Sequence, residues 1–381
     1  MARDQALAER IDAAVDAALA EGRLVGGTLM VSRDGEVVYE RHAGLADREA
    51  GRPVAKDTIF RYASLTKPMV SVAALALVED GTISLDAAVT DWLPDFRPKL
   101  ADGTQPVITL RHLMTHTSGL TYDFMEPPER GYEASGISNG FDRVGVSMEE
   151  NLAKIAAWPL NFPPGSAWNY SVSTDVLGAV LAKAAGKPLS EVVRDKVTGP
   201  LGLVDTGFKV TDPGRLAVAY ANSETGPVKM ADGHEVPFLA SPLRYAPSRA
   251  LSGNSFESGG AGMVGRADDY VTFLETLRTG GGAILKPESA ALMSTNATGD
   301  LLVTAAGPGY GFSLGAAVLG DPSVTMLPTP QTAGTWNWGG VYGGSWFVDP
   351  AKALVVVNLT NTAIEGMAGV LPGAVRDAVY A

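Results

Sequence analysis

Strand-type sequence occurs at both ends of this chain, and the long middle is mainly helix-type. Near the N-terminus, apolar residues lie on both sides of Asp34-Gly35, a pair that favours a tight β-hairpin. Near the C-terminus, three segments again have strand character: 309–320, 334–350 and 353–361. Helix-type runs lie between these ends: 147–157, 174–185, 189–197 and 268–278. We therefore expect one sheet assembled from both ends of the chain, with the helical middle inserted as a second lobe.

This arrangement predicts an α+β fold with two lobes and an active site in the cleft between them. Residues 1–63 and 285–381 are expected to form an α/β lobe. Its antiparallel sheet is flanked by an N-terminal helix and by a last helix over 370–379. Residues 64–284 are expected to form a mainly helical lobe. The length of 381 residues agrees with two lobes, because ~150 residues is the usual size of one domain.

The charge and the residue content exclude several classes of protein. The 42 acidic and 30 basic residues give a formal net charge of -12, the wrong sign for binding a phosphate backbone or an anionic membrane surface. No cysteine is present, which excludes disulfides, thiol nucleophiles and cysteine-ligated metals. The first residues are charged throughout, and the apolar stretch 69–78 is half of the ~20 residues that span a bilayer. We expect a cytoplasmic protein without nucleic-acid or membrane partners, and its oligomeric state stays open.

A serine and a lysine lie three residues apart at the start of the alanine-rich, helix-type segment 64–81. Ser64 and Lys67 would share one face of a helix, so that the amine reaches the hydroxyl. A serine is a weak nucleophile until a neighbour takes its proton, and a partly desolvated lysine can do this. With this composition ~0.7 such pairs arise by chance, so the motif alone is weak. A plain helix N-cap is an equal alternative for Ser64.

Two later motifs strengthen the catalytic interpretation of Ser64. Tyr170 follows a turn-forming Pro-Gly segment and precedes a helix-type run, a junction from which a phenol can face a cleft. Gly339 and Gly340 follow Trp338 in a strand-type segment, where the missing side chains let another backbone or a ligand come close. A structural tyrosine and a strand bulge are the alternatives.

Taken in order, these motifs resemble those of a known superfamily. The Ser-x-x-Lys motif is followed by His-Thr-Ser-Gly-Leu at 116–120, by the Pro-Gly-Ser to Tyr-Ser segment at 164–171, and by Trp-Gly-Gly at 338–340. The chain resembles the serine β-lactamase-like superfamily, which includes class C β-lactamases and penicillin-binding proteins. Within it, the sequence is most similar to the family VIII carboxylesterases. The resemblance covers nearly the whole chain.

The resemblance also implies roles for individual residues. Ser64 would be the acylated nucleophile, with Lys67 and Tyr170 exchanging protons with it, and the first proton acceptor stays open between the two. The backbone N–H groups of Ser64 and Val341 would form the oxyanion hole. The residues expected at the substrate pocket are Tyr122, Phe124, Trp338, Gly339 and Gly340.

Two departures from class C β-lactamases point to the substrate. Val172 stands where those enzymes have an amide, and Trp338 stands where they have a cation. Both changes favour an uncharged ester over a penicillin. We therefore expect hydrolysis of short-chain carboxylic esters, with water as acyl acceptor and with no cofactor or metal. The alternatives are a β-lactamase, a D-aminoacyl peptidase, an acyltransferase, or a catalytically silent binding relative.

Other motifs in the chain have weaker interpretations. Two segments match Gly-x-Ser-x-Gly, centred on Ser138 and Ser313. No histidine follows Ser313, and no strand-type segment precedes Ser138, so neither fits an α/β-hydrolase. The Gly-x-Gly-x-x-Gly match at 260–265 also lacks a preceding strand, which argues against a dinucleotide site. The resemblance to the superfamily implies that this segment is a structural turn near the cleft. His112 and His116 lack an acidic partner between them and are not expected to bind metal.

Overall fold

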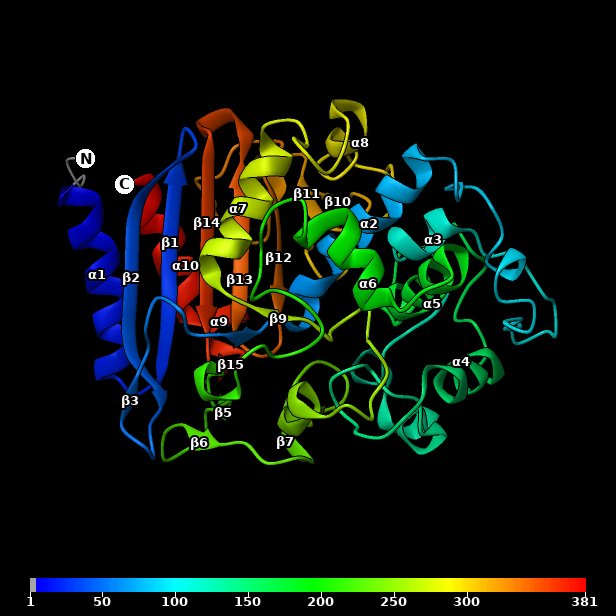
Figure 1. Cartoon of the computed structure of the whole chain (residues 1–381), viewed down its shortest axis with the longest axis horizontal. Helices are drawn as coiled ribbons and strands as arrows, with labels where there is room; N and C mark the ends of the chain where they lie inside the picture. Colours follow the sequence, from blue (N-terminus) through cyan, green and yellow to red (C-terminus); the bar gives the residue numbers. More distant parts are fainter. Residues whose placement is uncertain (1–4) are drawn as a thin grey trace.

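An eight-stranded sheet built from both ends of the chain is the centre of the fold (Figure 1). The computed structural model describes residues 5–381. Neighbouring strands are antiparallel throughout, in the order β10-β11-β12-β13-β14-β1-β2-β3. The strands are β1 (Gly26–Arg33), β2 (Glu36–Asp47), β3 (Arg52–Pro53), β10 (Tyr310–Phe312), β11 (Ala317–Leu319), β12 (Trp336–Gly340), β13 (Gly344–Asp349) and β14 (Leu354–Thr360). The predicted antiparallel sheet is confirmed.

The pairing of β1 with β14 joins the N-terminal strands to the C-terminal strands of the sheet. Their register runs from Gly27 opposite Thr360 to Arg33 opposite Leu354, and every residue of β14 is buried. β1 also continues into β2 through the predicted hairpin. Asp34 and Gly35 both have positive φ, +55° and +83°, as a two-residue turn of this kind requires.

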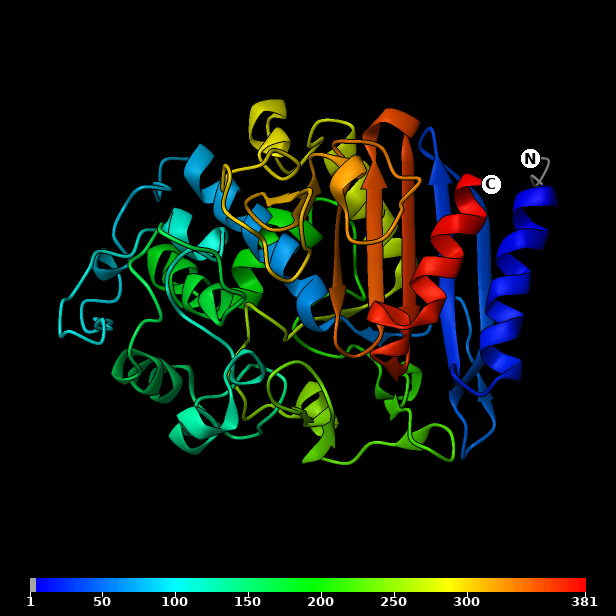
Figure 2. The same cartoon turned by 180° about the vertical axis from the view of Figure 1, so that it is seen from behind.

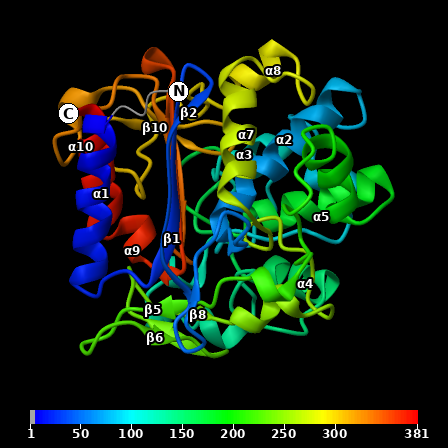
Figure 3. The same ribbon diagram turned by 60° about the vertical axis from the view of Figure 1, so that its left-hand side comes forward.

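The first and last helices cover one face of the sheet. Figures 2 and 3 show α1 (Gln5–Ala20) and α10 (Val370–Tyr380) side by side on this face, together with α9 (Glu365–Ala368). α1 and α10 present apolar stripes to each other and to the sheet, made of Leu7, Ile11, Val15, Leu371, Val375 and Val379. Both terminal helices were predicted, although the first four residues of the expected N-terminal helix lie outside the described part of the chain.

The opposite face of the sheet is covered by α7 (Ala267–Arg278), which packs on β1 and β14 (Figure 3). Ser32 of β1 donates a hydrogen bond of 2.6 Å to Glu275 of α7. The predicted lobe boundary at residue 284 assigned this helix to the helical lobe, whereas it packs on the sheet. Periodicity identified a helix with one apolar face, but it did not identify the surface that this face covers.

Helices and the long loops between them make up the rest of the middle segment, and several of these helices pack on α2 (Thr66–Glu79). Every residue of α2 from Thr66 to Leu77 is buried, as expected for a helix that is apolar on all sides. The run predicted at 189–197 is divided into α6 and a π-helical turn over Arg194–Thr198. The other helices are α3 (Leu110–Met114), α4 (Met148–Ala157), α5 (Ser173–Ala185), α6 (Leu189–Val193) and α8 (Pro287–Ala291).

The remaining short strands form three small sheets that are separate from the main sheet. They are β4 (Phe60–Arg61) with β9 (Val264–Gly265), β5 (Tyr220–Ala221) with β6 (Val228–Lys229) and β15 (Thr362–Ala363), and β7 (His234–Val236) with β8 (Leu243–Tyr245). β4 is followed by the short segment 62–65, after which α2 begins. Within residues 5–381, no helix is long and apolar enough to cross a membrane.

The packing of α1 gives a first prediction about stability. Ile11 is fully buried between α1, α10 and the sheet. Replacing Ile11 with Ala leaves a cavity there and is expected to lower the free energy of unfolding by about 2–5 kcal/mol. Chemical denaturation measures this loss. Glu9→Ala on the exposed side of α1 is the control, and an equal loss in both variants would contradict the assigned packing.

Candidate active site

Ser64 lies in a tight 3-10 turn, Ala63–Leu65, between β4 and α2. Ala63, immediately before it, has a φ of +47°, a conformation that costs a residue with a side chain about 1–3 kcal/mol. The N-cap of α2 is Leu65, and no side chain caps the helix. The interpretation of Ser64 as a plain helix N-cap is therefore wrong. The strained turn instead presents the hydroxyl of Ser64 at the start of the helix.

The structure brings Ser64, Lys67 and Tyr170 together. Lys67 Nζ donates a hydrogen bond to Ser64 Oγ over 3.0 Å, and the Tyr170 hydroxyl donates to the same oxygen over 2.6 Å. Lys67 is one helical turn after Ser64, whereas Tyr170 comes from the loop that precedes α5. Ser64 is 8% exposed, Tyr170 7% and Lys67 1%, so water has little access to the amine.

Burial decides the proton affinity of the Lys67 amine. Loss of hydration lowers the pKa of Lys67 to about 7, and the negative charge of Asp175 partly opposes this change. At neutral pH a large fraction of the amine is therefore unprotonated, unlike an ordinary lysine with a pKa of about 10.4. The second acceptor of Lys67 is the carbonyl of Gly260, at 2.9 Å.

The Tyr170 phenol responds to burial in the opposite sense. Burial raises the pKa of Tyr170 above its ordinary value, and the hydrogen bonds with Ser64 and Trp338 only partly offset this. The indole Nε1 of Trp338 donates to the Tyr170 oxygen over 3.1 Å. The phenol is thus a neutral hydrogen-bond donor to Ser64 at ordinary pH.

The two glycines after Trp338 allow β12 to lie directly against the serine turn. A Cβ atom on Gly340 would be 2.3 Å from the carbonyl oxygen of Tyr62 and 3.4 Å from the Cβ of Ala63. Only a residue without a side chain fits this position. The pairing of β12 with β13 is regular, so the strand-bulge alternative is wrong. Val341 is the residue that follows this close contact in the chain.

Two buried backbone amides at this contact have no partner. Among residues 5–381, no acceptor is found for the N–H groups of Ser64 and Val341, although both residues are buried. Nearly all buried N–H groups in proteins are paired. The carbonyl of Val341 accepts a hydrogen bond from the Tyr245 hydroxyl over 3.0 Å, which fixes the orientation of this segment. Both amides are therefore available to a ligand oxygen.

Aromatic rings surround the Tyr170 phenol. The rings of Tyr122 and Tyr170 are 5.0 Å apart, and Phe124 stacks on Tyr122 at 4.8 Å. Phe238 contacts Phe124 edge-on at 5.8 Å, and it comes from the loop between β7 and β8. A hydrogen bond of 3.1 Å from Ala240 N to Phe124 O holds this loop in place. The sequence analysis missed Phe238, because nothing near it in the chain distinguishes it from other loop residues.

A buried carboxylate beside Lys67 was also missed. Asp175 lies in the first turn of α5 and is fully buried. It accepts hydrogen bonds from the hydroxyl of Ser258 at 2.5 Å and from the amide of Gly260 at 3.3 Å. The available signal was a charged residue beside the otherwise apolar run 176–181, five positions after Tyr170. The glycine-rich turn at 260–265 does lie at the site, and it provides the carbonyl acceptor for Lys67.

The other sequence motifs do not form sites. Ser138 is fully buried and donates to Asp142, and Ser313 is fully buried and donates to the Ala316 carbonyl. Nδ1 of His112 completes the capping box of α3, and Nδ1 of His116 contacts the Ser171 hydroxyl at 3.1 Å. In the described part of the chain, no group of three or more acidic or histidine side chains is arranged to hold a metal ion.

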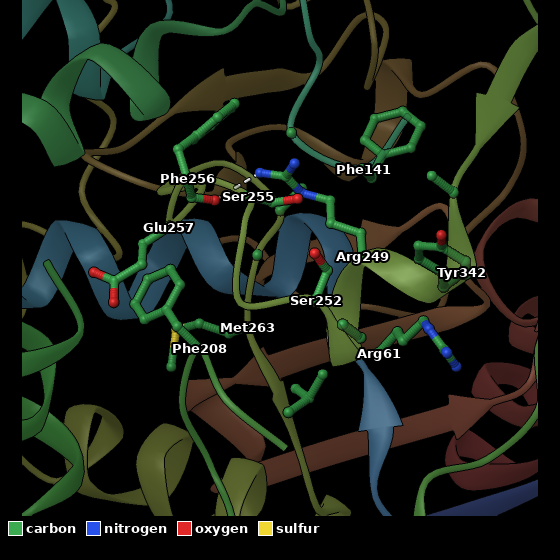
Figure 4. A pocket seen from close by; sticks show the side chains of 16 residues that line it. Arg61, Phe141, Phe208, Arg249, Ser252, Ser255, Phe256, Glu257, Met263 and Tyr342 are labelled. Atoms are coloured by element: carbon green, nitrogen blue, oxygen red, sulfur yellow. Dashed lines mark hydrogen bonds between the residues drawn. The ribbon is translucent and has the colours of Figure 1, made fainter. Parts of the chain in front are cut away.

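A separate small pocket of about 50 Å³ lies beyond the glycine-rich turn (Figure 4). Ala261, Gly262 and Met263 line it, but Ser64, Lys67 and Tyr170 do not. In Figure 4 the guanidinium of Arg249 lies against Phe256, and that of Arg61 points the other way. This volume holds one or two water molecules, so the pocket is too small for a substrate.

A known protein family matches almost the whole chain. The model of the Beta-lactamase family matches residues 11–380. The chain belongs to the beta-lactamase family. The membership expected from the Ser-x-x-Lys, Tyr and Trp-Gly-Gly motifs, and with it a serine hydrolase type of enzyme, is confirmed.

Individual members of the beta-lactamase family are similar over nearly the whole chain. It is 50% identical over 378 residues to Esterase EstB of Burkholderia gladioli, a match that covers 98% of this chain and 95% of the relative. The solved structure of EstCE1, a hydrolase with promiscuous acyltransferase activity, is 45% identical with a TM-score of 0.94 and covers 99% of both chains. A class C beta lactamase from Rhodobacter sphaeroides, 20% identical with a TM-score of 0.66 over 98% of both chains, shares the fold.

The lowered pKa of Lys67 gives a prediction for the reactivity of Ser64. A serine-directed fluorophosphonate is expected to label Ser64 at a rate that rises with pH around a midpoint near 7, as the Lys67 amine loses its proton. Mass spectrometry of the labelled protein gives the position and the rate. A midpoint near the ordinary lysine value of about 10.4, or label on Ser138 or Ser313, would contradict the assigned site.

Proposed function

We propose that this protein is a serine carboxylesterase that hydrolyses short-chain esters through an acyl-enzyme on Ser64. The observation that supports it best is the position of Ser64 Oγ between a largely unprotonated amine and a neutral phenol, beside two unpaired amides. The similarity to Esterase EstB and to EstCE1 supports the same activity. The fold alone does not distinguish among the chemistries of this family.

In the proposed acylation, Ser64 Oγ attacks the ester carbonyl carbon while its proton moves to the amine of Lys67. Lys67 is the better first acceptor, because its pKa is about 7 whereas burial keeps Tyr170 protonated. The carbonyl electron pair moves onto oxygen, and the amides of Ser64 and Val341 donate hydrogen bonds to this oxyanion. One donor of this kind typically contributes ~10²–10³ in rate.

Collapse of the tetrahedral intermediate breaks the bond between carbon and the alcohol oxygen. The Tyr170 phenol donates a proton to the departing alcohol and regains one from the Lys67 ammonium, so both residues return to their starting states. In the second half, water gives its proton to Lys67 and attacks the acyl carbon. The bond from carbon to Ser64 Oγ then breaks, Oγ recovers a proton, and a carboxylic acid leaves.

The lining of the site supports an uncharged substrate. The rings of Tyr122, Trp168 and Trp338 lie 5.0, 6.3 and 5.1 Å from that of Tyr170, and Phe238 extends the aromatic surface through Phe124. At the position where class C relatives have a cation, the Trp338 indole instead binds the phenol of Tyr170. A substrate carboxylate would have no cationic partner there, which disfavours penicillins and D-aminoacyl peptides.

Acyl transfer to an alcohol is the second candidate. The acyl-enzyme is the same, and only the acceptor differs. The aromatic lining favours an apolar alcohol at the place where water would otherwise attack, and EstCE1 is described as a hydrolase with promiscuous acyltransferase activity. Ester and acid products measured with and without an added short alcohol separate the two outcomes.

The nucleophile and the substrate class are tested together on p-nitrophenyl esters of graded acyl length. We expect fast turnover of short acyl chains, a loss of about 10³-fold or more in Ser64→Ala, and weak cleavage of a chromogenic cephalosporin. Ser138→Ala is the matched control and is expected to keep its activity. Activity that survives in Ser64→Ala, or a cephalosporin cleaved faster than the esters, would overturn the proposal.

The contact between Gly340 and the serine turn gives a further prediction. Gly340→Ala pushes β12 away from Ala63 and with it the amide of Val341. We expect kcat to fall by about 10²-fold or more, because the oxyanion loses a donor, while circular dichroism still shows a folded protein. Gly373→Ala is the control, since a Cβ there meets no atom within 4 Å. Unchanged kcat in Gly340→Ala would exclude the assigned oxyanion hole.

A further inference from the structure

The buried carboxylate of Asp175 lies beside the Lys67 amine but is not hydrogen-bonded to it. Asp175 belongs to α5, Lys67 to α2, and the residue between them is Gly260 of the glycine-rich turn. Gly260 donates its amide to Asp175 and accepts from Lys67 at its carbonyl. One residue therefore connects the two charged groups through its backbone.

The turn that contains Gly260 is held by Asp175. The Ser258 hydroxyl donates to Asp175 Oδ1, and the Ala261 amide donates to the Ser258 oxygen at 2.9 Å. The packing leaves no room for side chains, because a Cβ on Gly260 would be 2.6 Å from Asp175 Oδ2, and a Cβ on Gly259 would be 2.4 Å from the Thr174 carbonyl. This tight packing fixes the position of the Gly260 carbonyl, which accepts the hydrogen bond from Lys67.

The second oxygen of the carboxylate has no hydrogen-bond partner. Asp175 Oδ2 is buried and unpaired among residues 5–381, so hydrogen bonds screen only Oδ1. An unscreened charge in a site of low polarity acts strongly on neighbouring charges. Within the described residues, Asp175 is the one charged group that shifts the pKa of Lys67, and it acts to raise it against the effect of burial.

The other charged and titratable groups around this pair come from three segments of the chain: 115–122, the loop before α5, and the turn Pro247–Leu251. Tyr122 and Tyr170 face Lys67, with ring centres 5.2 and 4.6 Å from Nζ, and both phenols stay neutral because burial raises their pKa values. His116 stays neutral because burial lowers its pKa. Burial raises the pKa of Asp175, and the charge of Arg249, which lines the small pocket in Figure 4, partly opposes this rise.

We propose that Asp175 is a positioning residue for the reaction of Ser64: it holds the turn segment formed by Ser258, Gly259 and Gly260 against Lys67, and its negative charge favours the ammonium form of Lys67 over the unprotonated amine. The inference rests on the proposed function, since it assumes that the unprotonated amine activates Ser64. Without the charge of Asp175, the ammonium form of Lys67 loses a favourable interaction, and the amine loses its proton at lower pH.

The variant Asp175→Asn removes the negative charge of this side chain but keeps its shape. The amide oxygen still accepts from Ser258 and Gly260, and the amide nitrogen takes the place of the unpaired Oδ2. We expect the acid limb of the pH–rate profile for fluorophosphonate labelling of Ser64 to move down by about one pH unit. Asp175→Ser, which is uncharged and shorter, is the second variant if Asp175→Asn does not fold.

Asp142→Asn is the matched control. Asp142 is a second buried aspartate near the site, but it is not among the groups that shift the pKa of Lys67. In the Asp142→Asn variant, the acid limb of the pH–rate profile for labelling of Ser64 is expected to stay at the wild-type position. The position of the limb does not depend on the amount of folded protein, so a loss of stability in either variant does not imitate the effect.

Two outcomes overturn the inference about Asp175. One is a rate that falls equally at every pH in Asp175→Asn with an unmoved limb, which would mean a purely structural role. The other is an equal shift in Asp142→Asn. The labelling experiment needs no ester turnover, so an inert wild type in the ester assay together with a shifted limb would reject the proposed esterase and keep the inference.

Discussion

The pairing of β1 with β14 holds the two ends of the chain together, and the site depends on it. The serine turn follows the N-terminal strands, whereas Trp338 and Gly340 belong to the C-terminal strands. When β14 pairs with β1 and β13 with β14, β12 takes a fixed position in the sheet, with its last residue against Ala63. The serine turn and the end of β12, which come from distant parts of the chain, become neighbours through this sheet.

Burial gives the polar groups of the site their chemical properties. The same loss of hydration lowers the pKa of the Lys67 amine and raises the pKa of the Tyr170 phenol, so one group is ready to accept a proton and the other to donate one. Such groups are stable in the interior only when their hydrogen bonds are nearly complete. Besides their hydrogen bonds with Ser64, Lys67 donates to the Gly260 carbonyl, and Tyr170 accepts from the Trp338 indole.

Much of the fold and part of the site followed from the sequence. The Asp34-Gly35 hairpin, the buried strand around Val356 and the two terminal helices have local signals, because turn geometry and periodicity are properties of a few neighbouring residues. Spacing and family resemblance predicted a site at Ser64, Lys67 and Tyr170, and the side chains of Lys67 and Tyr170 lie within hydrogen-bond distance of Ser64 Oγ. α7 was expected in the helical lobe but packs on the sheet, because an apolar helix face does not by itself indicate which surface it will cover.

Phe238 and Asp175 were missed for a related reason. Each lies in a segment whose own sequence predicts only a loop or a helix, and each acquires its place at the site from contacts with residues far along the chain. The sequence by itself determined which elements form and which reactive side chains the protein has, because those depend on local composition and spacing. Only the tertiary structure decided the strained turn at Ala63, the free amides and the proton affinity of Lys67, because these depend on packing between distant segments and on the exclusion of water.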